Sequence, residues 1–173
     1  MNRWAIFLSG KGSTSQALLN ISEYLNIKLV VSSRKSAFGL KRANRMGVST
    51  LVLNKEPDWN NLSAELKKRK INKIFLLGFM KILPEKFCQE WEGKVFNIHP
   101  SLLPDYAGKD AMLKSYQDKK SMGVSIHHVT SVMDAGDVIR QKAIENIEKD
   151  FELHKVWMSF LEQRLIREVG VRL

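Results

Sequence analysis

Five short apolar runs, separated by amphipathic stretches, are the feature that most constrains how this chain can fold. The runs lie at 4–8, 27–31, 50–53, 73–77 and 95–98. Continuous apolar runs of this length are typical of strands that are covered on both faces, as in a parallel sheet. Helical spacing of apolar residues marks the stretches between them, at 14–25, 38–46 and 58–70. The alternation predicts an α/β fold: a doubly wound, mostly parallel twisted sheet with helices on both faces.

The rhythm of the sequence changes after residue 104. A short helix is predicted at 110–117, two strands at 123–129 and 137–144, and a closing helix at 153–169. No internal repeat, low-complexity tract or linker interrupts the chain. We therefore expect a single domain over residues 1–173. Its ligand site should lie at the carboxyl ends of the strands, where open α/β sheets bind their ligands.

The composition is that of an ordinary globular protein, with 44% hydrophobic and 27% charged residues. No apolar run approaches the roughly 20 residues that a membrane span needs, and no signal-peptide pattern opens the chain. The only cysteine, Cys88, excludes an intrachain disulfide and fits a reducing compartment. A cytoplasmic location without a membrane is therefore expected. No two His or Cys residues have metal-ligand spacing, so no metal is expected.

The net charge of +10 is the unusual bulk property of the chain. A basic surface favours solubility, and it can also steer anionic substrates into a cleft. Nucleic acid is a third kind of partner, but the densest basic run, at 67–70, has no interleaved aromatic residue. The dipole at the end of a helix explains that run better. Small anionic substrates are therefore favoured over nucleic acid, and both a monomer and a homodimer remain open.

An octapeptide that contains a polar pair begins directly after the apolar Val95-Phe96. It reads Asn97-Ile98-His99-Pro100-Ser101-Leu102-Leu103-Pro104. Side chains two residues apart on an extended chain point the same way, so Asn97 and His99 can face one pocket. An amide donor beside an imidazole suits the holding of a carbonyl oxygen and the movement of a proton. Asp134, on a turn-like segment, supplies an acid. The alternative interpretations are a polar strand-end cap and an ordinary turn residue.

A glycine-containing loop at 9–13, Ser-Gly-Lys-Gly-Ser, follows the first strand and opens the first helix. Backbone N–H groups at a helix N-terminus can bind an anion, and Gly10 and Gly12 permit a close approach. Ser13 or Thr14 can add a hydroxyl donor. The loop is neither a Walker loop nor a complete GxGxxG fingerprint. It is consistent with a phosphate site, and also with a plain turn in which Ser13 caps the helix.

Together with the segments 78–83 and 125–130, these motifs occur in the order that is found in the folate-dependent formyltransferases. The chain resembles this family from Trp4 to about Val169, and within it the branch that acts on glycinamide ribonucleotide in purine synthesis. The resemblance implies a Rossmann-like enzyme that transfers a formyl group from 10-formyltetrahydrofolate, a co-substrate, to a primary amine. Three catalytic roles follow from it. Asn97 would donate to the formyl oxygen, His99 would stabilise charge and shuttle a proton, and Asp134 would orient His99 or relay the proton through water.

The resemblance also implies two binding sites. The phosphate and the rest of the acceptor would contact Gly10, Lys11, Gly12, Ser13, Thr14, Pro100 and Glu162. The folate would lie against Phe79, Met80, Lys81, Ile82, Leu83, Val129 and Ser131. From the residues alone, the apolar loop at 78–83 is equally consistent with core packing. Among the histidines, His127 is expected to face inward, His128 to lie at the surface and His154 to be structural.

Two departures from the family pattern lie on the acceptor side. Residues 109–112 read Lys-Asp-Ala-Met where the purine enzymes carry a histidine, and Ser159 stands where a glutamine is expected. The donor is therefore better determined than the acceptor. Glycinamide ribonucleotide is the first acceptor to expect. The alternatives are an amino-sugar nucleotide as acceptor, or a non-catalytic homologue that binds folate.

Overall fold

The structure, a computed structural model, describes residues 2–118, 122–144 and 150–173. Its strands form one sheet in the order β3-β2-β1-β4-β5-β6-β7. Their bounds are β1 Arg3–Leu8, β2 Asn26–Ser32, β3 Ser49–Val52, β4 Lys73–Leu76, β5 Val95–His99, β6 Met122–His128 and β7 Val138–Ile144. The helices are α1 Ser13–Leu19, α2 Phe38–Arg45, α3 Trp59–Lys68, α4 Glu85–Glu90, α5 Ala111–Gln117 and α6 Phe151–Gly170.

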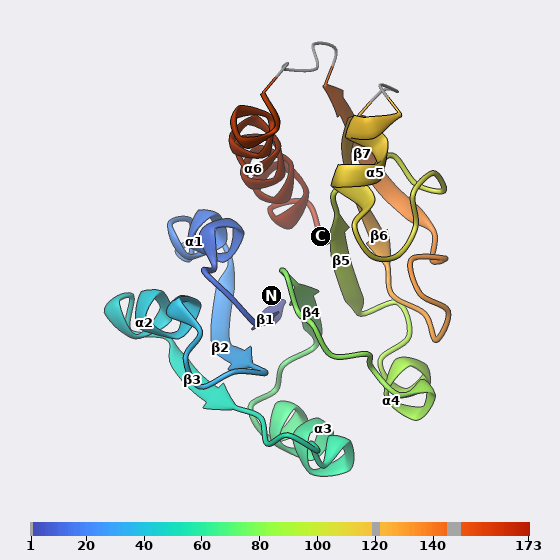
Figure 1. Ribbon diagram of the computed structural model, residues 1–173. Helices are drawn as coiled ribbons and strands as arrows, with labels where there is room; N and C mark the ends of the chain where they lie inside the picture. The colour runs from blue at the N-terminus through green and yellow to red at the C-terminus, as the bar shows by residue number, and fades with distance from the viewer. Residues whose placement is uncertain (1, 119–121, 145–149) are drawn as a thin grey trace.

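The sheet is parallel from β3 to β5, whereas β6 pairs antiparallel with both β5 and β7. Helices α1, α2 and α6 cover one face, and α3 and α4 cover the other (Figure 1). The predicted α/β fold with a mostly parallel, doubly wound sheet is therefore confirmed. The two strands predicted after residue 104 form its antiparallel end.

Burial on both faces explains why the central strands are continuously apolar. Successive side chains of β1 alternate between the two cores: Trp4, Ile6 and Leu8 pack under α1, α2 and α6, while Ala5 and Phe7 pack under α3 and α4. All five are almost completely inaccessible to solvent. β1 therefore has no solvent-facing side, and its sequence shows no alternation of polar and apolar residues.

Two details of the predicted elements were wrong. The helix predicted at 14–25 ends at Leu19, and the chain continues in turns to Leu25. Leu25 is buried in the core, so it carries the apolar pattern without being helical. Helix α4 was not predicted, because its six residues are too few to show a helical period. It begins directly after Pro84, which is its N-cap residue.

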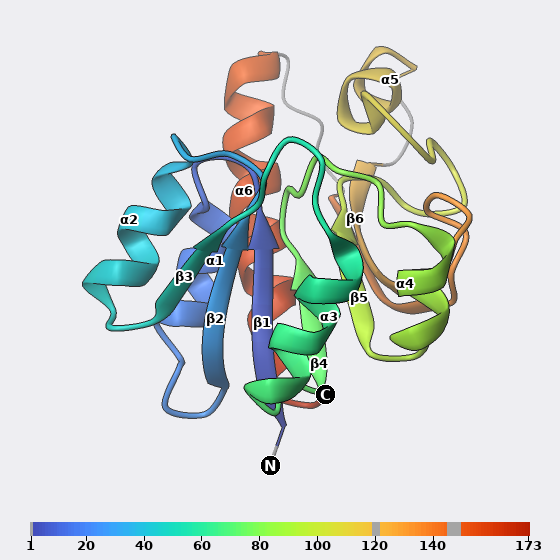
Figure 2. The same ribbon diagram turned by 90° about the horizontal axis from the view of Figure 1, so that it is seen from below.

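The carboxyl ends of the parallel strands lie along one edge of the sheet, at the top of Figure 2. The loops that follow β1, β2, β3 and β4 gather there, together with the beginning of α6. Both ends of the chain lie at the opposite edge. In the part of the chain that the structure describes, no helix has the length and apolarity needed to cross a membrane.

Candidate active site

The end of β5 places two polar side chains at this edge. Asn97 is half-buried and His99 is buried. Their two-residue spacing directs both side chains to the same face of the sheet, as the sequence predicts. The antiparallel pairing of β5 with β6 sets Asn97 opposite His127. Asn97 Nδ2 lies 3.1 Å from His127 Nε2, so His127 joins the pair and faces inward as expected.

The turn between β6 and β7 brings in the acid. Asp134 Oδ2 accepts a hydrogen bond of 2.9 Å from the backbone N–H of Gly108 and lies 3.4 Å from His99 Nδ1. Asp134 Oδ1 lies 3.4 Å from Asn97 Nδ2 and 3.5 Å from His127 Nε2. The three residues predicted to be catalytic are therefore in direct contact, although the acid is far from the other two in the sequence.

The backbone of Asp134 adopts the left-handed conformation, with φ of 53°. Few residues other than glycine occupy this region, and aspartate and asparagine are among those that tolerate it. The turn is also tightly packed: a Cβ atom on Gly136 would lie 1.9 Å from the carbonyl oxygen of His128. Glycine at 136 thus allows the turn to approach β6 closely enough for Asp134 to reach both histidines.

Burial alone would raise the pKa of the Asp134 carboxyl. The contact with His127, the Gly108 N–H donor and the nearby imidazoles of His99 and His127 outweigh it, and together they hold the pKa below its usual value. The carboxylate is therefore ionised at neutral pH. Because the pKa is lower in the folded chain, ionised Asp134 stabilises the fold above the ordinary Asp pKa of about 3.9. That contribution is lost as the pH falls through the lower, folded-state value.

The backbone contacts of the two histidines define which nitrogen carries a proton. His99 Nε2 lies 3.0 Å from the carbonyl oxygen of Tyr106, and His127 Nδ1 lies 2.8 Å from that of His128. A carbonyl can only accept, so each of these nitrogens bears a hydrogen and donates it. His99 Nδ1 and His127 Nε2 are left facing Asp134 and Asn97. The reactive sides of both rings therefore point into the site.

A buried hydrogen-bond network anchors the segment that follows His99. Ser125 Oγ on β6 donates to Ser101 O at 2.6 Å and accepts from Leu103 N at 3.0 Å. Gln141 Nε2 on β7 donates to Leu103 O at 2.6 Å and to Ser125 Oγ at 2.9 Å. The Ser125 hydroxyl thereby uses its one donor and both acceptor positions. Sequence reasoning missed Ser125 and Gln141 as positioning residues, because single polar residues on strands form no recognisable motif.

The glycine loop contacts the final helix. Thr14 Oγ1 on α1 donates to Glu162 Oε2 on α6 at 2.9 Å, which brings together two residues of the predicted acceptor set. Burial raises the pKa of Glu162, and the Thr14 hydrogen bond offsets part of that rise. Gly12 has a φ of 69°, and a Cβ there would come within 2.7 Å of the Gly39 Cα. Gly12 is also the N-cap residue of α1, so Ser13 does not cap this helix.

The rest of the acceptor set is divided between the glycine loop and the segment that follows β5. Pro100 is half-buried beside His99, and Gly10 and Lys11 are exposed at the tip of the glycine loop. Lys11 and Ser159 line a pocket of about 400 Å³ between this loop and α6. Ser159 is one of the two places where the sequence departs from the family pattern, and it lies in the wall of this pocket.

The loop after β4, expected to contact folate, has two kinds of side chain. Phe79 and Leu83 face the core, where Phe79 meets the Phe7 ring edge-on at 5.3 Å. Met80 and Ile82 are 69% and 74% exposed and present apolar side chains outward. The core-packing interpretation therefore applies to Phe79 and Leu83, and the exposed Met80 and Ile82 remain predicted folate contacts. Of the other members of the set, Lys81 and Val129 are half-buried and Ser131 is exposed. Lys81 Nζ donates to Lys55 O at 2.6 Å.

One residue ties this loop to the glycine loop. Ser9 Oγ, which is buried at the end of β1, accepts a 2.8 Å hydrogen bond from Met80 N and lies 2.5 Å from Ser33 Oγ. Ser9 opens the Ser-Gly-Lys-Gly-Ser motif, but the motif itself does not predict this contact. Its hydroxyl fixes the backbone of one expected binding loop relative to the other.

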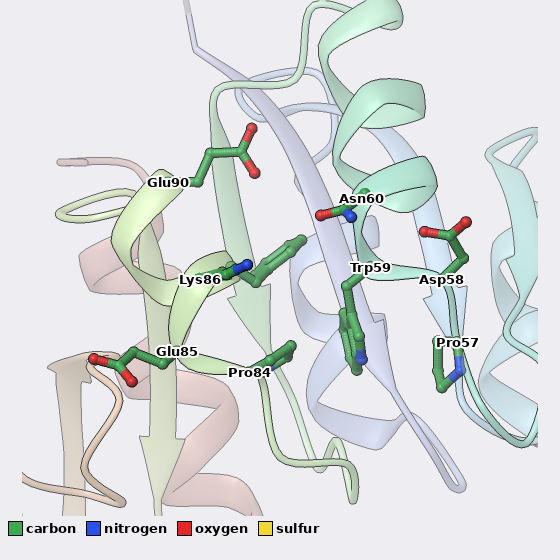
Figure 3. A pocket seen from close by; sticks show the side chains of 9 residues that line it. Pro57, Asp58, Trp59, Asn60, Pro84, Glu85, Lys86 and Glu90 are labelled. Atoms are coloured by element: carbon green, nitrogen blue, oxygen red, sulfur yellow. The ribbon is translucent and has the colours of Figure 1, made fainter.

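A second pocket of about 400 Å³ opens beside the same loop, between the beginnings of α3 and α4 (Figure 3). Trp59 and Phe87 form part of its wall, with ring centroids 5.5 Å apart. Its three acidic groups already have partners: Asp58 accepts from Asn61 N, Glu85 accepts from Gln89 Nε2, and Glu90 pairs with Lys67. None of the residues predicted to bind a ligand lines this pocket.

The remaining histidines lie outside the cluster. His128, expected at the surface, is half-buried, because its ring packs 5.0 Å from the ring of Phe96. His154 is buried beside Tyr116, which agrees with a structural role. Within the described ranges, no group of three or more His, Cys, Asp or Glu side chains could hold a metal ion.

Comparison with known proteins gives consistent matches. A family model described as formyl transferase matches residues 2–165. Phosphoribosylglycinamide formyltransferase of Bacillus subtilis is 31% identical over 176 aligned positions, covering 95% of this chain and 87% of that protein. The crystal structure of phosphoribosylglycinamide formyltransferase from Anaplasma phagocytophilum has a TM-score of 0.93 and 35% identity, covering 99% of this chain and 86% of that one.

A longer human protein is also similar. The trifunctional purine biosynthetic protein adenosine-3 is 35% identical over 153 residues, and the match covers 82% of this chain. The chain spans 15% of the length of that protein, and between 12% and 19% of the other trifunctional relatives.

Proposed function

Because the chain belongs to the formyl transferase family, we propose that it transfers a formyl group from 10-formyltetrahydrofolate to the amine of glycinamide ribonucleotide, in purine synthesis. The contact of Asn97, His99 and Asp134 at the carboxyl edge of the sheet carries the proposal. Residues 1–173 would act as one catalytic domain on small anionic substrates in the cytoplasm. The relatives named as phosphoribosylglycinamide formyltransferases support this choice of acceptor.

In the proposed reaction, the acceptor amine attacks the formyl carbon and a new C–N bond forms. The bond from that carbon to N10 of the folate then breaks, and the proton lost by the amine ends on N10. Negative charge develops on the formyl oxygen between these steps. Asn97 Nδ2 is the donor for this oxygen. It carries two hydrogens, which contact His127 and Asp134, and the longer 3.4 Å contact with Asp134 is the one that the formyl oxygen replaces.

His99 and Asp134 move the proton. The Tyr106 carbonyl holds His99 Nε2–H, so His99 Nδ1 is directed to the side of the site where the amine loses its proton. The ionised Asp134 attracts that proton electrostatically. The proton passes to this pair, directly or through a water, and from there to the departing nitrogen.

The two substrates occupy opposite sides of this cluster. The acceptor phosphate binds the backbone N–H groups of the loop 10–14, and Glu162 contacts the acceptor's ribose. The pterin of the folate lies along the backbone of the loop 79–83, with Met80 and Ile82 as apolar walls and with Val129 and Ser131 beside it. Ser9 joins the two sides through its hydrogen bond with Met80.

Replacing Ser9 with alanine is expected to raise the KM for the folate donor about tenfold, because losing the partner of a half-buried N–H costs about 1–2 kcal/mol. The KM for the acceptor should change less than twofold. Ser33→Ala is the matched control, since it removes the neighbouring hydroxyl and leaves the Ser9–Met80 hydrogen bond in place. Steady-state kinetics with each substrate varied in turn measures both values. A donor KM that rises equally in both variants would contradict this role of Ser9.

An acceptor panel tests the proposed substrate. We expect formylation of glycinamide ribonucleotide, followed by the absorbance change of the folate, to exceed that of an amino-sugar nucleotide at least tenfold. Ser159, which lines the pocket beside Lys11 in place of the expected glutamine, is the observation that favours the second acceptor. Faster formylation of the amino-sugar nucleotide would therefore identify it as the acceptor, and the proposed formyl transfer would still stand. Donor binding without transfer to any amine would instead identify a non-catalytic homologue.

A further inference from the structure

The positive charge of the chain is concentrated in one segment. Residues 24–55 contain no aspartate or glutamate, yet they supply seven of the ten net positive charges. These cations are Lys28, Arg34, Lys35, Lys41, Arg42, Arg45 and Lys55. The segment comprises β2 and β3, the two strands at one side of the sheet, and α2, which connects them. We refer to residues 24–55 as the basic edge.

The basic edge lies directly against the glycine loop. Ser33 Oγ lies 2.5 Å from the Oγ of Ser9, the first residue of the loop. Gly39 N donates to Gly10 O at 3.1 Å, and Arg42 Nε donates to Lys11 O at 3.0 Å. The close approach of Gly12 to Gly39 packs the two segments together. Arg34 and Lys35 lie between Ser33 and Gly39, the two residues that contact Ser9 and Gly10, and therefore stand next to the loop that is proposed to bind phosphate. The loop after β2 and the loop after β1 lie at the same edge of the sheet (Figure 2).

The charges of the basic edge are not neutralised within the described chain. None of the ion pairs among the described residues includes a residue of 24–55. Arg34, Lys35 and Lys41 are exposed. Uncompensated charges of one sign produce a potential that extends from the surface and raises the local concentration of oppositely charged ligands. Arg34 and Lys35 place part of this potential beside the glycine loop, because they follow Ser33, which contacts Ser9.

We propose that the basic edge is a capture surface for a phosphate-bearing acceptor, which it attracts and delivers to the glycine loop. This inference rests on the proposed function only in assigning the acceptor phosphate to that loop. The surface acts over a distance, so it changes binding at low ionic strength and not the chemical step. Arg34 and Lys35 carry the effect most directly, because their side chains are exposed at the end of β2 that meets the loop.

The test compares two double charge reversals. Arg34→Glu/Lys35→Glu changes the basic edge, and Lys68→Glu/Lys94→Glu is the matched control. The control alters the net charge equally, but Lys68 ends α3 and Lys94 precedes β5, so both lie at the amino ends of the strands. The probe is ribose 5-phosphate, and its binding is followed by NMR shifts of the Gly10, Gly12 and Ser13 amides. Ionic strengths of about 0.02 M and about 0.5 M are compared, since the Debye length shrinks between them from about 20 Å to about 4 Å.

At the low ionic strength, we expect Arg34→Glu/Lys35→Glu to raise the Kd about tenfold and the control to raise it less than twofold. The difference should nearly vanish at the high ionic strength. Equal effects of the two reversals, or no binding of ribose 5-phosphate by the wild-type chain, would overturn the inference. So would submicromolar binding of a single-stranded oligonucleotide at about 0.15 M salt that depends on Arg34 and Lys35. The readout does not require turnover, so a chain that binds the probe in this pattern but transfers no formyl group would refute only the proposed function.

Discussion

Asp134→Asn is expected to lower the rate of formyl transfer by about 10³-fold while the chain stays folded. The substitution keeps the size of the side chain, and asparagine tolerates the left-handed backbone at this position. It removes the negative charge that faces both His99 and His127. An aspartate that orients and charges a catalytic histidine typically contributes on this scale or more. The substitution should therefore lower kcat strongly, and it should lower the melting temperature only slightly because one stabilising charge is lost.

The matched control for this prediction is Asp137→Asn. Asp137 belongs to the same turn, but its side chain is exposed and only its backbone carbonyl contacts His128. Transfer kinetics and thermal unfolding should show that both variants are folded at the assay temperature and that only Asp134→Asn loses activity. If Asp134→Asn retains more than about a tenth of the wild-type rate, Asp134 is not part of the proton path.

Gly136→Ala is expected to have the second largest effect, at least about 10²-fold on the transfer rate. The new methyl carbon would lie 1.9 Å from the carbonyl oxygen of His128 and 2.7 Å from the carbonyl carbon. Both are backbone atoms, so no side-chain rotation can relieve the clash. The turn must therefore move off β6 and carry Asp134 away from the histidines. A misplacement of about 1 Å in a catalytic site can reduce the rate by about this factor.

Ala135→Ser provides the comparison for Gly136→Ala. It also adds an atom to the turn, but Ala135 is exposed and the new hydroxyl points into solvent, so activity should be unchanged. Kinetics of both variants, with circular dichroism to confirm folding, measures the difference. Wild-type activity in Gly136→Ala would mean that the position of Asp134 relative to β6 is not important for the reaction.

The part of the site that sequence reasoning predicted is local. Asn97 and His99 share one strand, and a two-residue spacing fixes their common direction without knowledge of the rest of the fold. The contacts of Asp134 with Gly108 and His127 depend on how three separate segments meet. The spacing of residues along the chain does not predict contacts between segments that are remote in the sequence. The family resemblance, and not the chemistry of the turn, supplied Asp134 as the acid.

The positioning residues were harder to predict for the same reason. Ser9, Ser125 and Gln141 act through hydrogen bonds to backbone groups that are remote in the sequence. A single serine or glutamine has no pattern that distinguishes this use from exposure to solvent. The apolar loop 78–83 shows a related limit: alternate residues face the core and the solvent, so hydrophobicity alone could not separate packing residues from a ligand wall.

The most direct test of the central claim is transfer of a ¹³C-labelled formyl group from 10-formyltetrahydrofolate to glycinamide ribonucleotide. The measurement compares the wild-type chain with Asn97→Ala under identical conditions, and donor binding is measured in the same samples. We predict labelled product from the wild type, and a rate about 10²–10³-fold lower from the variant with donor binding retained. Equal rates for the two proteins, or donor binding by the wild type without any labelled product, would contradict the account.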